Sequence, residues 1–202
     1  IPLFEQNGFV ISLDYYVYEK AFQWLQKFSD QLPTDFRISL NVSPLHFEEP
    51  EIFVKKIREL IRTYHVDTFR LTFEITESTY VNNTEAVNCV IRGLKQHNIQ
   101  ISMDDFGSGY SSLNALKDLL FNEVKIDRKF LGDSLTENAK IVLQEVFHML
   151  KRMGKSIVCE GVETEDIAEF LKEEGCDEIQ GFLYYRPMCE EDFEKLFHTP
   201  TA

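Results

Sequence analysis

The chain has 202 residues, of which 44% are hydrophobic and 27% are charged, a composition that excludes disordered, collagen-like and coiled-coil proteins. With 34 acidic residues against 21 basic ones the formal net charge is -13, which disfavours binding to DNA, RNA or a membrane surface. A chain of this length buries enough surface to need no disulfide, so we expect residues 1–202 to form one domain.

Amphipathic helical segments alternate with short β-type segments along the chain. Helices are predicted where apolar residues recur at helical spacing, and strands where β-branched and aromatic residues cluster. In chain order we expect a helix over Leu13–Phe28, a strand over Arg37–Val42, a helix over Ile52–Ile61, a strand over Phe69–Ile75, a helix over Ala86–Leu94, strands over Ile99–Met103 and Val124–Ile126, a long helix between the capping box Ser134-Leu135-Thr136-Glu137 and Gly154, a strand over Ser156–Cys159, a helix over Ile167–Leu171 and a strand over Glu178–Gln180. This alternation is typical of βα units around a parallel sheet.

Each predicted strand carries apolar residues at one parity and polar residues at the other. The alternate positions that carry polar residues are Ser39 and Asn41, Thr72 and Glu74, Ser102 and Asp104, Lys125 and Asp127, Ser156 and Glu160, and Glu178 and Gln180. An antiparallel sheet with one hydrated face has the same pattern, but the intervening helices favour parallel strands. In a parallel βα barrel such residues gather at the end where active sites lie.

We therefore expect an α/β fold, a (β/α)8 barrel of the TIM type. The predicted strands are fewer than the eight of a complete barrel of about 250 residues. About two N-terminal strands are thus expected to be absent from this chain, which would begin within the fold on a helix.

The cysteines and the N-terminus bear on the compartment. Four cysteines, Cys89, Cys159, Cys176 and Cys189, have neither C-x-x-C spacing nor the density of a disulfide-rich secreted domain, so we expect reduced thiols. No apolar run approaches the roughly 18–20 residues of a membrane span, and the first residues lack the basic region of a signal peptide. The sequence predicts a cytoplasmic domain without membrane contact, within a parent protein that another segment can anchor.

Acidic and amide side chains concentrate at the ends of the predicted strands. Asp104 and Asp105 directly follow one strand; alone, such a pair before Gly107 is typical of a turn or a helix cap. The other strand ends add Asn41, Glu74, Lys125, Asp127, Glu160 and Gln180. Carboxylates this close repel one another unless cations neutralise them, and an oxygen-only ligand set favours Mg²⁺ or Mn²⁺ over Zn²⁺. Two such ions about 3.5–4 Å apart support phosphoryl hydrolysis, which is the predicted reaction class.

An ordered series of motifs resembles the EAL domain family, phosphodiesterases that open cyclic di-GMP to linear pGpG. The series contains Ile1-Pro2-Leu3-Phe4-Glu5-Gln6-Asn7-Gly8, Asn41-Val42-Ser43, Glu74-Ile75-Thr76-Glu77, Asp104-Asp105-Phe106-Gly107-Ser108-Gly109-Tyr110-Ser111-Ser112-Leu113, Val124-Lys125-Ile126-Asp127, Glu160-Gly161-Val162-Glu163-Thr164, Gln180-Gly181-Phe182 and Arg186-Pro187. It covers nearly the whole chain, and its order is far more specific than any single motif. The resemblance implies a metal-dependent hydrolase of bacterial second-messenger signalling with cyclic di-GMP as its ligand.

The resemblance also implies which residues hold the two metal ions. Asn41, Glu74 and Asp104 would be metal ligands, and Asp105 would ligate the second ion. Asp127 and Gln180 would complete the surroundings of that second ion.

The remaining roles that the resemblance implies are catalytic and structural. Lys125 would hold the nucleophilic water, and Glu160 would be a base or a water-orienting group. Glu77 would anchor the loop Phe106–Leu113, with Gly107 and Gly109 as hinges, and the position of this loop would control the site and a contact in a homodimer. Glu163 would be a structural partner near the cleft rather than a ligand.

Some of these residues also fit structural roles. Lys125 fits an ion pair with Asp127 or Asp104, which is compatible with catalysis. Glu163 and Thr164 fit the cap of the helix that begins there. Ser111 and Ser112 fit a helix N-cap better than a nucleophile, because no His stands at a strand end to activate them.

The Glu-Ala-Leu motif that names the family does not occur in its expected place before Ile1-Pro2-Leu3. The resemblance implies that its Glu is a metal ligand and that a following Arg contacts a ligand phosphate. Because every other motif residue is intact, we expect a truncated piece of a competent enzyme, weak or inactive by itself, whose parent protein carries further signalling domains.

Two other functions remain open at this point. A catalytically silent sensor of cyclic di-GMP would use the same binding residues. A glycosidase-like barrel would use two carboxylates, but it needs aromatic sugar platforms at the barrel mouth, whereas the single Trp24 lies in a helical stripe.

Overall fold

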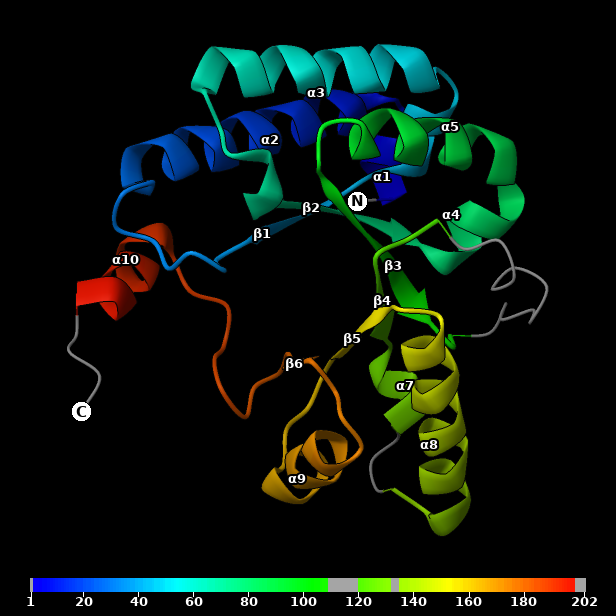
Figure 1. Cartoon of the computed structure of the whole chain (residues 1–202). Coiled ribbons are helices and arrows are strands. Elements are labelled where there is room, and N and C mark those ends of the chain that lie inside the picture. The colour runs from blue at the N-terminus through cyan, green and yellow to red at the C-terminus, as the bar shows by residue number, and fades with distance from the viewer. Residues whose placement is uncertain (1, 109–119, 132–134, 199–202) are drawn as a thin grey trace.

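A sheet of six parallel strands organises the computed structural model, which describes residues 2–108, 120–131 and 135–198 (Figure 1). The strands lie side by side in chain order: β1 (Ile38–Asn41), β2 (Leu71–Thr76), β3 (Gln100–Phe106), β4 (Glu123–Ile126), β5 (Ser156–Cys159) and β6 (Glu178–Ile179). Every neighbouring pair is parallel, so the predicted α/β fold is confirmed and the antiparallel alternative is wrong. The described strands form a curled half-barrel, consistent with part of a TIM-type barrel.

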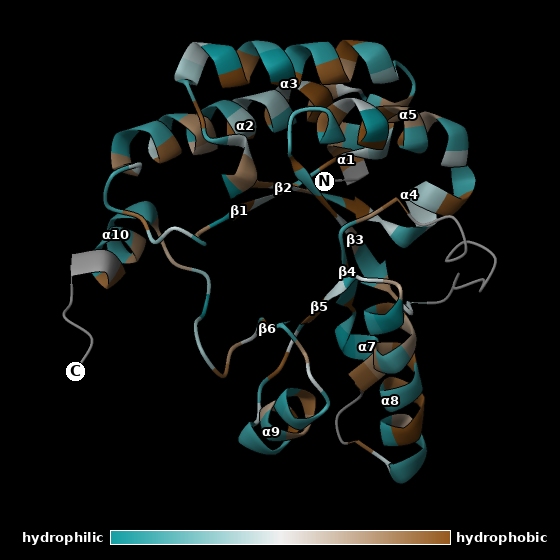
Figure 2. Cartoon of the chain, in the orientation of Figure 1, coloured by the Kyte–Doolittle hydropathy of each residue, from teal (hydrophilic) through white to brown (hydrophobic). Residues whose placement is uncertain are grey.

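Helices connect the strands and cover the convex side of the sheet. The longer ones are α2 (Phe9–Phe28), α3 (Pro50–Tyr64), α5 (Thr84–Lys95), α8 (Glu137–Arg152), α9 (Glu165–Glu173) and α10 (Glu190–His198). Shorter helices and 3-10 turns are α1 (Pro2–Gln6), η1 (Pro44–Phe47), η2 (Thr68–Arg70), α4 (Glu77–Asn82) and α7 (Arg128–Leu131). In Figure 2 each longer helix carries both hydrophobic and hydrophilic residues, as helices packed on a sheet do. Among the described residues, no helix combines the length and hydropathy that crossing a membrane requires.

The start of one predicted strand is wrong. Phe69 and Arg70 belong to the turn η2, and the strand begins only at Leu71. The backbone N–H of Arg70 donates to the carbonyl of Asp67 at 3.0 Å, and its Nη1 donates to the carbonyl of Pro33 at 2.7 Å. These two bonds hold the segment in a turn although its side chains favour a strand.

The start of the long helix also differs from the prediction. α8 begins at Glu137, and Thr136 is its N-cap, with the Thr136 hydroxyl accepting from the backbone N–H of Ala139 at 3.2 Å. Ser134, the predicted cap, lies outside the described residues. Both residue types cap helices well, so the pattern of residue types alone allowed either start.

The two faces of the strands meet different surroundings, as their alternation predicts. Leu71, Phe73 and Ile75 of β2 are fully buried beneath the helices, where Tyr18 and Phe22 of α2 join the core. Side chains on the opposite face of the strands line a cavity of about 120 Å³. Its lining residues are Asp35, Arg37, Ser39, Thr72, Glu74, Glu123, Lys125, Val158, Glu178 and Gln180. The concave side of the half-barrel is therefore polar.

Candidate active site

The polar side chains at the strand ends lie at one edge because the strands are parallel and in register. Asn41 ends β1 beside Glu74 of β2, and Thr76 of β2 lies beside Asp104 of β3. Lys125 lies in β4, whereas the remaining members follow their strands directly: Asp127 after β4, Glu160 after β5 and Gln180 after β6. Parallel strands end at the same edge, so residues far apart in sequence share one mouth.

Lys125 connects three carboxylates at this mouth. Its Nζ lies 2.6 Å from Glu160 Oε1, 2.8 Å from Glu74 Oε1 and 3.4 Å from Asp104 Oδ1. Both Lys125 and Glu74 are nearly inaccessible to solvent, at 5% and 6% exposure. Burial by itself lowers the pKa of Lys125, but the carboxylates of Glu74 and Asp104 outweigh it and raise the pKa above its ordinary value. The ammonium is therefore charged and holds the three carboxylates together.

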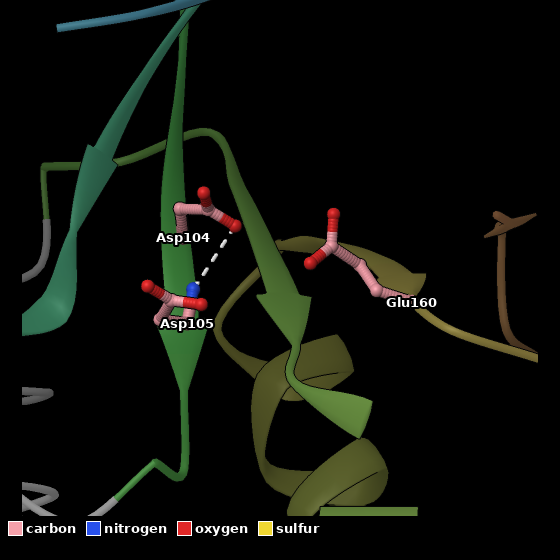
Figure 3. A group of neighbouring side chains, drawn as sticks. All are labelled: Asp104, Asp105 and Glu160. Carbon is pink, nitrogen blue, oxygen red and sulfur yellow. Dashed lines mark hydrogen bonds between the residues drawn. The ribbon is translucent and has the colours of Figure 1, made fainter. Parts of the chain in front are cut away.

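A second feature is a cluster of carboxylate oxygens beside Lys125. One oxygen each from Asp104, Asp105 and Glu160 lie within 4.8 Å of one another, and Figure 3 shows these side chains approaching from β3 and from the end of β5. Burial raises the pKa of Asp105, and the charge of Asp104 adds to the rise. Burial also raises the pKa of Glu160, although the hydrogen bond from Lys125 opposes it. Lys125 thus leaves part of the negative charge uncompensated.

Adjacent aspartates reach the same cluster because β3 is irregular at its end. In a regular strand successive side chains point to opposite faces. Here the register with β4 shifts between Met103 and Phe106, and Asp105 adopts a left-handed backbone conformation with φ 56°. The Asp105 backbone N–H donates to Asp104 Oδ1 at 3.0 Å. Asp tolerates this conformation better than most residues, so the pair Asp104-Asp105 can direct both carboxylates to one site.

The other predicted site residues lie around this cluster. Besides burial and Asp104, the neighbouring carboxylate of Asp127 raises the pKa of Asp105. Asp127 Oδ1 accepts from the backbone N–H of Lys129 at 2.6 Å. Gln180 lines the cavity that Glu74 and Lys125 also line. Asn41 is exposed at the end of β1.

Glu77 and Glu163 lie outside the carboxylate cluster. Glu77 is buried, and its Oε2 accepts from the backbone N–H of Gly107 at 3.1 Å. Glu163 Oε1 lies 2.5 Å from Arg128 Nη1, and Thr164 rather than Glu163 is the N-cap residue of α9. Of the predicted loop Phe106–Leu113, the residues from Gly109 onward, including Ser111 and Ser112, lie outside the described part of the chain.

Three residues at the site have no role in the sequence prediction. The Tyr18 hydroxyl donates to the backbone carbonyl of Asn41 at 2.7 Å, but Tyr18 belongs to an apolar helical stripe that gave no sign of this contact. Glu123 lines the cavity, and burial raises its pKa. It lies two residues before Lys125 in the same strand, and this spacing could have identified it as a residue of the polar face. Arg128 forms an ion pair with Glu163. The one sequence feature that places Arg128 near the site is that it directly follows Asp127.

A glycine allows this last contact. Gly161 has φ 68°, and a Cβ there would lie 2.7 Å from Arg128 Cβ. Only glycine therefore lets the segments that follow β4 and β5 approach each other so closely.

Comparison with known proteins agrees with this arrangement of fold and side chains. A sequence profile of the EAL domain matches residues 1–187. The chain belongs to the EAL domain family. The bifunctional diguanylate cyclase/cyclic di-GMP phosphodiesterase MucR of Pseudomonas aeruginosa is 34% identical over 192 residues, covering 95% of this chain and 28% of MucR. Another protein of that organism, named a cyclic di-GMP phosphodiesterase, is 32% identical over 196 residues, covering 96% of this chain and 33% of the relative.

A solved EAL structure has the same fold. The MucR phosphodiesterase in complex with cyclic di-GMP superposes with a TM-score of 0.87 at 33% identity, covering 95% of this chain and 78% of that chain. The EAL chain described here spans only 28% to 33% of the full length of the two curated relatives. The predicted family and fold are confirmed.

The EAL domain does not place its tryptophan where a glycosidase needs one. Trp24 is 9% exposed, and its ring packs against Phe28, Phe36 and Phe193 with centroids 4.8, 5.8 and 5.7 Å away. It thus lies in the aromatic core next to α10 rather than at the strand ends. The position of Trp24 and the family membership both disfavour the glycosidase alternative.

Proposed function

We propose that this EAL domain hydrolyses cyclic di-GMP to linear pGpG with two bound Mg²⁺ or Mn²⁺ ions. The observation that carries the proposal is the buried contact of Lys125 with Glu74, Asp104 and Glu160, beside the further carboxylate of Asp105. The names of the relatives support the substrate, because both are called cyclic di-GMP phosphodiesterases.

The donor set fits divalent metal ions. The clustered groups offer only carboxylate oxygens, the ligands that Mg²⁺ and Mn²⁺ prefer, and part of their charge is not compensated by Lys125. Residues that would hold the ions are Asn41, Glu74, Asp104, Asp105 and Asp127, with Gln180 beside them. When bound, the ions would neutralise the carboxylates and the phosphodiester and favour deprotonation of water.

The protein's own groups account for the attack on phosphorus. The ammonium of Lys125 has three N–H donors and contacts three carboxylates. It would hold the attacking water oxygen by exchanging its longest contact, with Asp104 at 3.4 Å, for that oxygen. Glu160, in contact with Lys125, would accept a proton from that water. Water then adds to phosphorus, the P–O3′ bond breaks, and the proton that Glu160 accepted would pass to the released O3′, which leaves the 5′-phosphate of pGpG. Glu77, through Gly107, would fix the loop that begins at Phe106.

Chromatographic analysis of products tests the proposal. The protein with Mg²⁺ or Mn²⁺ is expected to convert cyclic di-GMP to pGpG, and excess EDTA is expected to stop turnover until metal is restored. Cyclic di-GMP binding without pGpG under all metal conditions would favour the silent sensor instead. Undiminished turnover in EDTA would contradict the metal-dependent mechanism.

Asp104→Asn is expected to weaken metal binding while it keeps the size of the side chain. The variant loses an anionic ligand. Because loss of even an outer-shell partner of a ligand lowers metal affinity by about 10-fold to 100-fold, we expect a loss of at least about 10-fold. Calorimetric titration with Mn²⁺ measures the affinity, and a titration of turnover against Mn²⁺ should shift in parallel. Asp166→Asn, at the exposed start of α9, is the matched control and should leave both titrations unchanged. Equal Mn²⁺ affinities of Asp104→Asn and the unmodified protein would remove Asp104 from the ligand set.

A further inference from the structure

Arg128 and Glu163 join the two segments that carry Asp127 and Glu160. Arg128 directly follows Asp127 and begins the short helix α7, and Glu163 lies three residues after Glu160. Arg128 Nη1 lies 2.5 Å from Glu163 Oε1. The side chain of Arg128 also passes close over Gly161, where an added Cβ would lie 2.7, 2.9 and 2.8 Å from Arg128 Cβ, Cγ and Cδ. One side chain of the segment after β4 thus spans two positions of the segment after β5.

The segment after β5 contains a point of backbone freedom. Its backbone N–H groups at Glu160 and Val162 donate to carbonyls at the ends of β4 and β6, each at 3.1 Å. Gly161 lies between these two hydrogen bonds with φ 68°, and glycine restricts its own backbone less than any other residue. The pair of Arg128 and Glu163 spans this glycine, so it limits the conformations of the backbone next to Glu160.

Arg128 reaches this segment from a firmly held helix. Leu131 of α7 is buried in the core. The ring of Phe130 packs so closely on Gly107, in the segment after β3, that no room remains for a Cβ there. Because α7 is fixed on these two sides, the guanidinium of Arg128 can constrain the segment that it contacts on the third.

We propose that Arg128 is a positioning residue, which holds Glu160 in place through its ion pair with Glu163. The inference rests on the proposed phosphodiesterase function, in which Glu160 accepts a proton from the attacking water. Glu160 Oε1 lies 2.6 Å from Lys125 Nζ, and a misplacement of about 1 Å at a reacting group can cost about 10²-fold in rate. Without the pair, part of the protein keeps the productive position. Loss of the pair is therefore expected to lower kcat by about tenfold and to change KM by less than about threefold.

The same pair contributes little to the stability of the fold. The side chains of Arg128 and Glu163 are 53% and 41% exposed, and ion pairs with this exposure are weak because water screens them. Its removal is expected to shift the midpoint of thermal unfolding by less than about 4 °C. A fall in kcat would then reflect the position of Glu160 rather than a loss of folded protein.

Steady-state kinetics of single and double variants test the inference. Arg128→Gln and Glu163→Gln should each lower kcat by about tenfold. The double variant should lose about the same factor rather than about a hundredfold, because both residues act through one pair. Arg128→Lys keeps a cation that can contact Glu163 and should retain kcat within about threefold.

A second ion pair of similar exposure provides the matched control. Lys151 Nζ lies 2.6 Å from Asp177 Oδ1, with side chains 37% and 40% exposed. This pair lies near the start of β5, where Asp177 Oδ2 accepts from the backbone N–H of Ile157 at 2.7 Å, whereas Glu160 follows the end of that strand. Lys151→Gln should therefore leave kcat unchanged.

Hydrogen exchange in the metal-free protein gives a readout that does not depend on turnover. The backbone N–H groups of Glu160 and Val162 are expected to exchange about twofold to fivefold faster in Arg128→Gln and in Glu163→Gln than in the unmodified protein. Mass spectrometry of the peptide that covers residues 160–163 measures the rate. In Lys151→Gln this peptide should exchange at the rate of the unmodified protein.

The outcomes separate this inference from the proposed function. Unchanged exchange in both glutamine variants would overturn the constraint on the segment after β5. Faster exchange with unchanged kcat would overturn the positioning role, and so would a rise in KM alone, which would make Arg128 a ligand-binding residue. Faster exchange in a protein that forms no pGpG, with or without the substitutions, would support the constraint and contradict the proposed function alone.

Discussion

Replacing Lys125 by methionine is expected to lower kcat for cyclic di-GMP by at least about 10²-fold, with a much smaller change in KM. The substitution keeps a long, unbranched side chain but removes the only ammonium that contacts Glu74, Asp104 and Glu160 among the described residues. Lys125 is assigned to the attacking water rather than to ground-state binding of the dinucleotide. Steady-state kinetics at saturating Mn²⁺ therefore measure the effect directly.

The same variant has a second expected signature in the metal-free protein. Without Lys125, the carboxylates of Glu74, Asp104 and Glu160 lose their counter-ion in a largely buried site, which costs about 3–5 kcal/mol in the free energy of unfolding. Divalent metal should restore much of this stability but not kcat. Lys56→Met, an exposed lysine of α3 paired with Glu59 at 3.9 Å, is the matched control. A Lys125→Met protein with the kcat of the unmodified protein would remove Lys125 from the mechanism.

Glu160→Gln is expected to lower kcat by at least about 10²-fold while leaving the Mn²⁺ titration and KM within about threefold. Glutamine keeps an oxygen for the hydrogen bond from Lys125 but cannot accept a proton from water. The separation of kcat from metal affinity distinguishes this variant from Asp104→Asn. Single-turnover measurements with excess enzyme would assign the loss to the chemical step.

A matched surface variant controls for the loss of one acidic residue. Glu173 is an exposed glutamate at the end of α9, and Glu173→Gln should retain the kcat of the unmodified protein. If Glu160→Gln changed only KM, Glu160 would be a binding residue, and another group would have to accept the proton.

The positions of helices and strands could be predicted where buried apolar residues recur at a regular spacing along the chain. The stripe that predicts Leu13–Phe28 reflects the buried face of α2, so it identifies the helix but starts four residues after the observed first residue, Phe9. The first turn of α2 contributes few core residues and follows its N-cap Gly8, which has φ 75°. Short helices such as α4 and α7 bury too few residues to show a period at all.

What the sequence by itself determined is the α/β class, the family and the set of polar side chains at the strand ends. These follow from local properties: strand alternation has a period of two, and motif order is read along the chain. Hence Asn41, Glu74, Lys125, Glu160 and Gln180 could be grouped at one edge before any contact was known.

Only the tertiary structure decided which of these groups touch. Lys125 contacts Glu74, Asp104 and Glu160 rather than Asp127, because the curl of the sheet and the register of β2, β3, β4 and β5 set the distances across it. The left-handed conformation of Asp105 has the same origin. Contacts between distant residues depend on how strands and helices pack in three dimensions, and residue patterns within one element do not encode that packing.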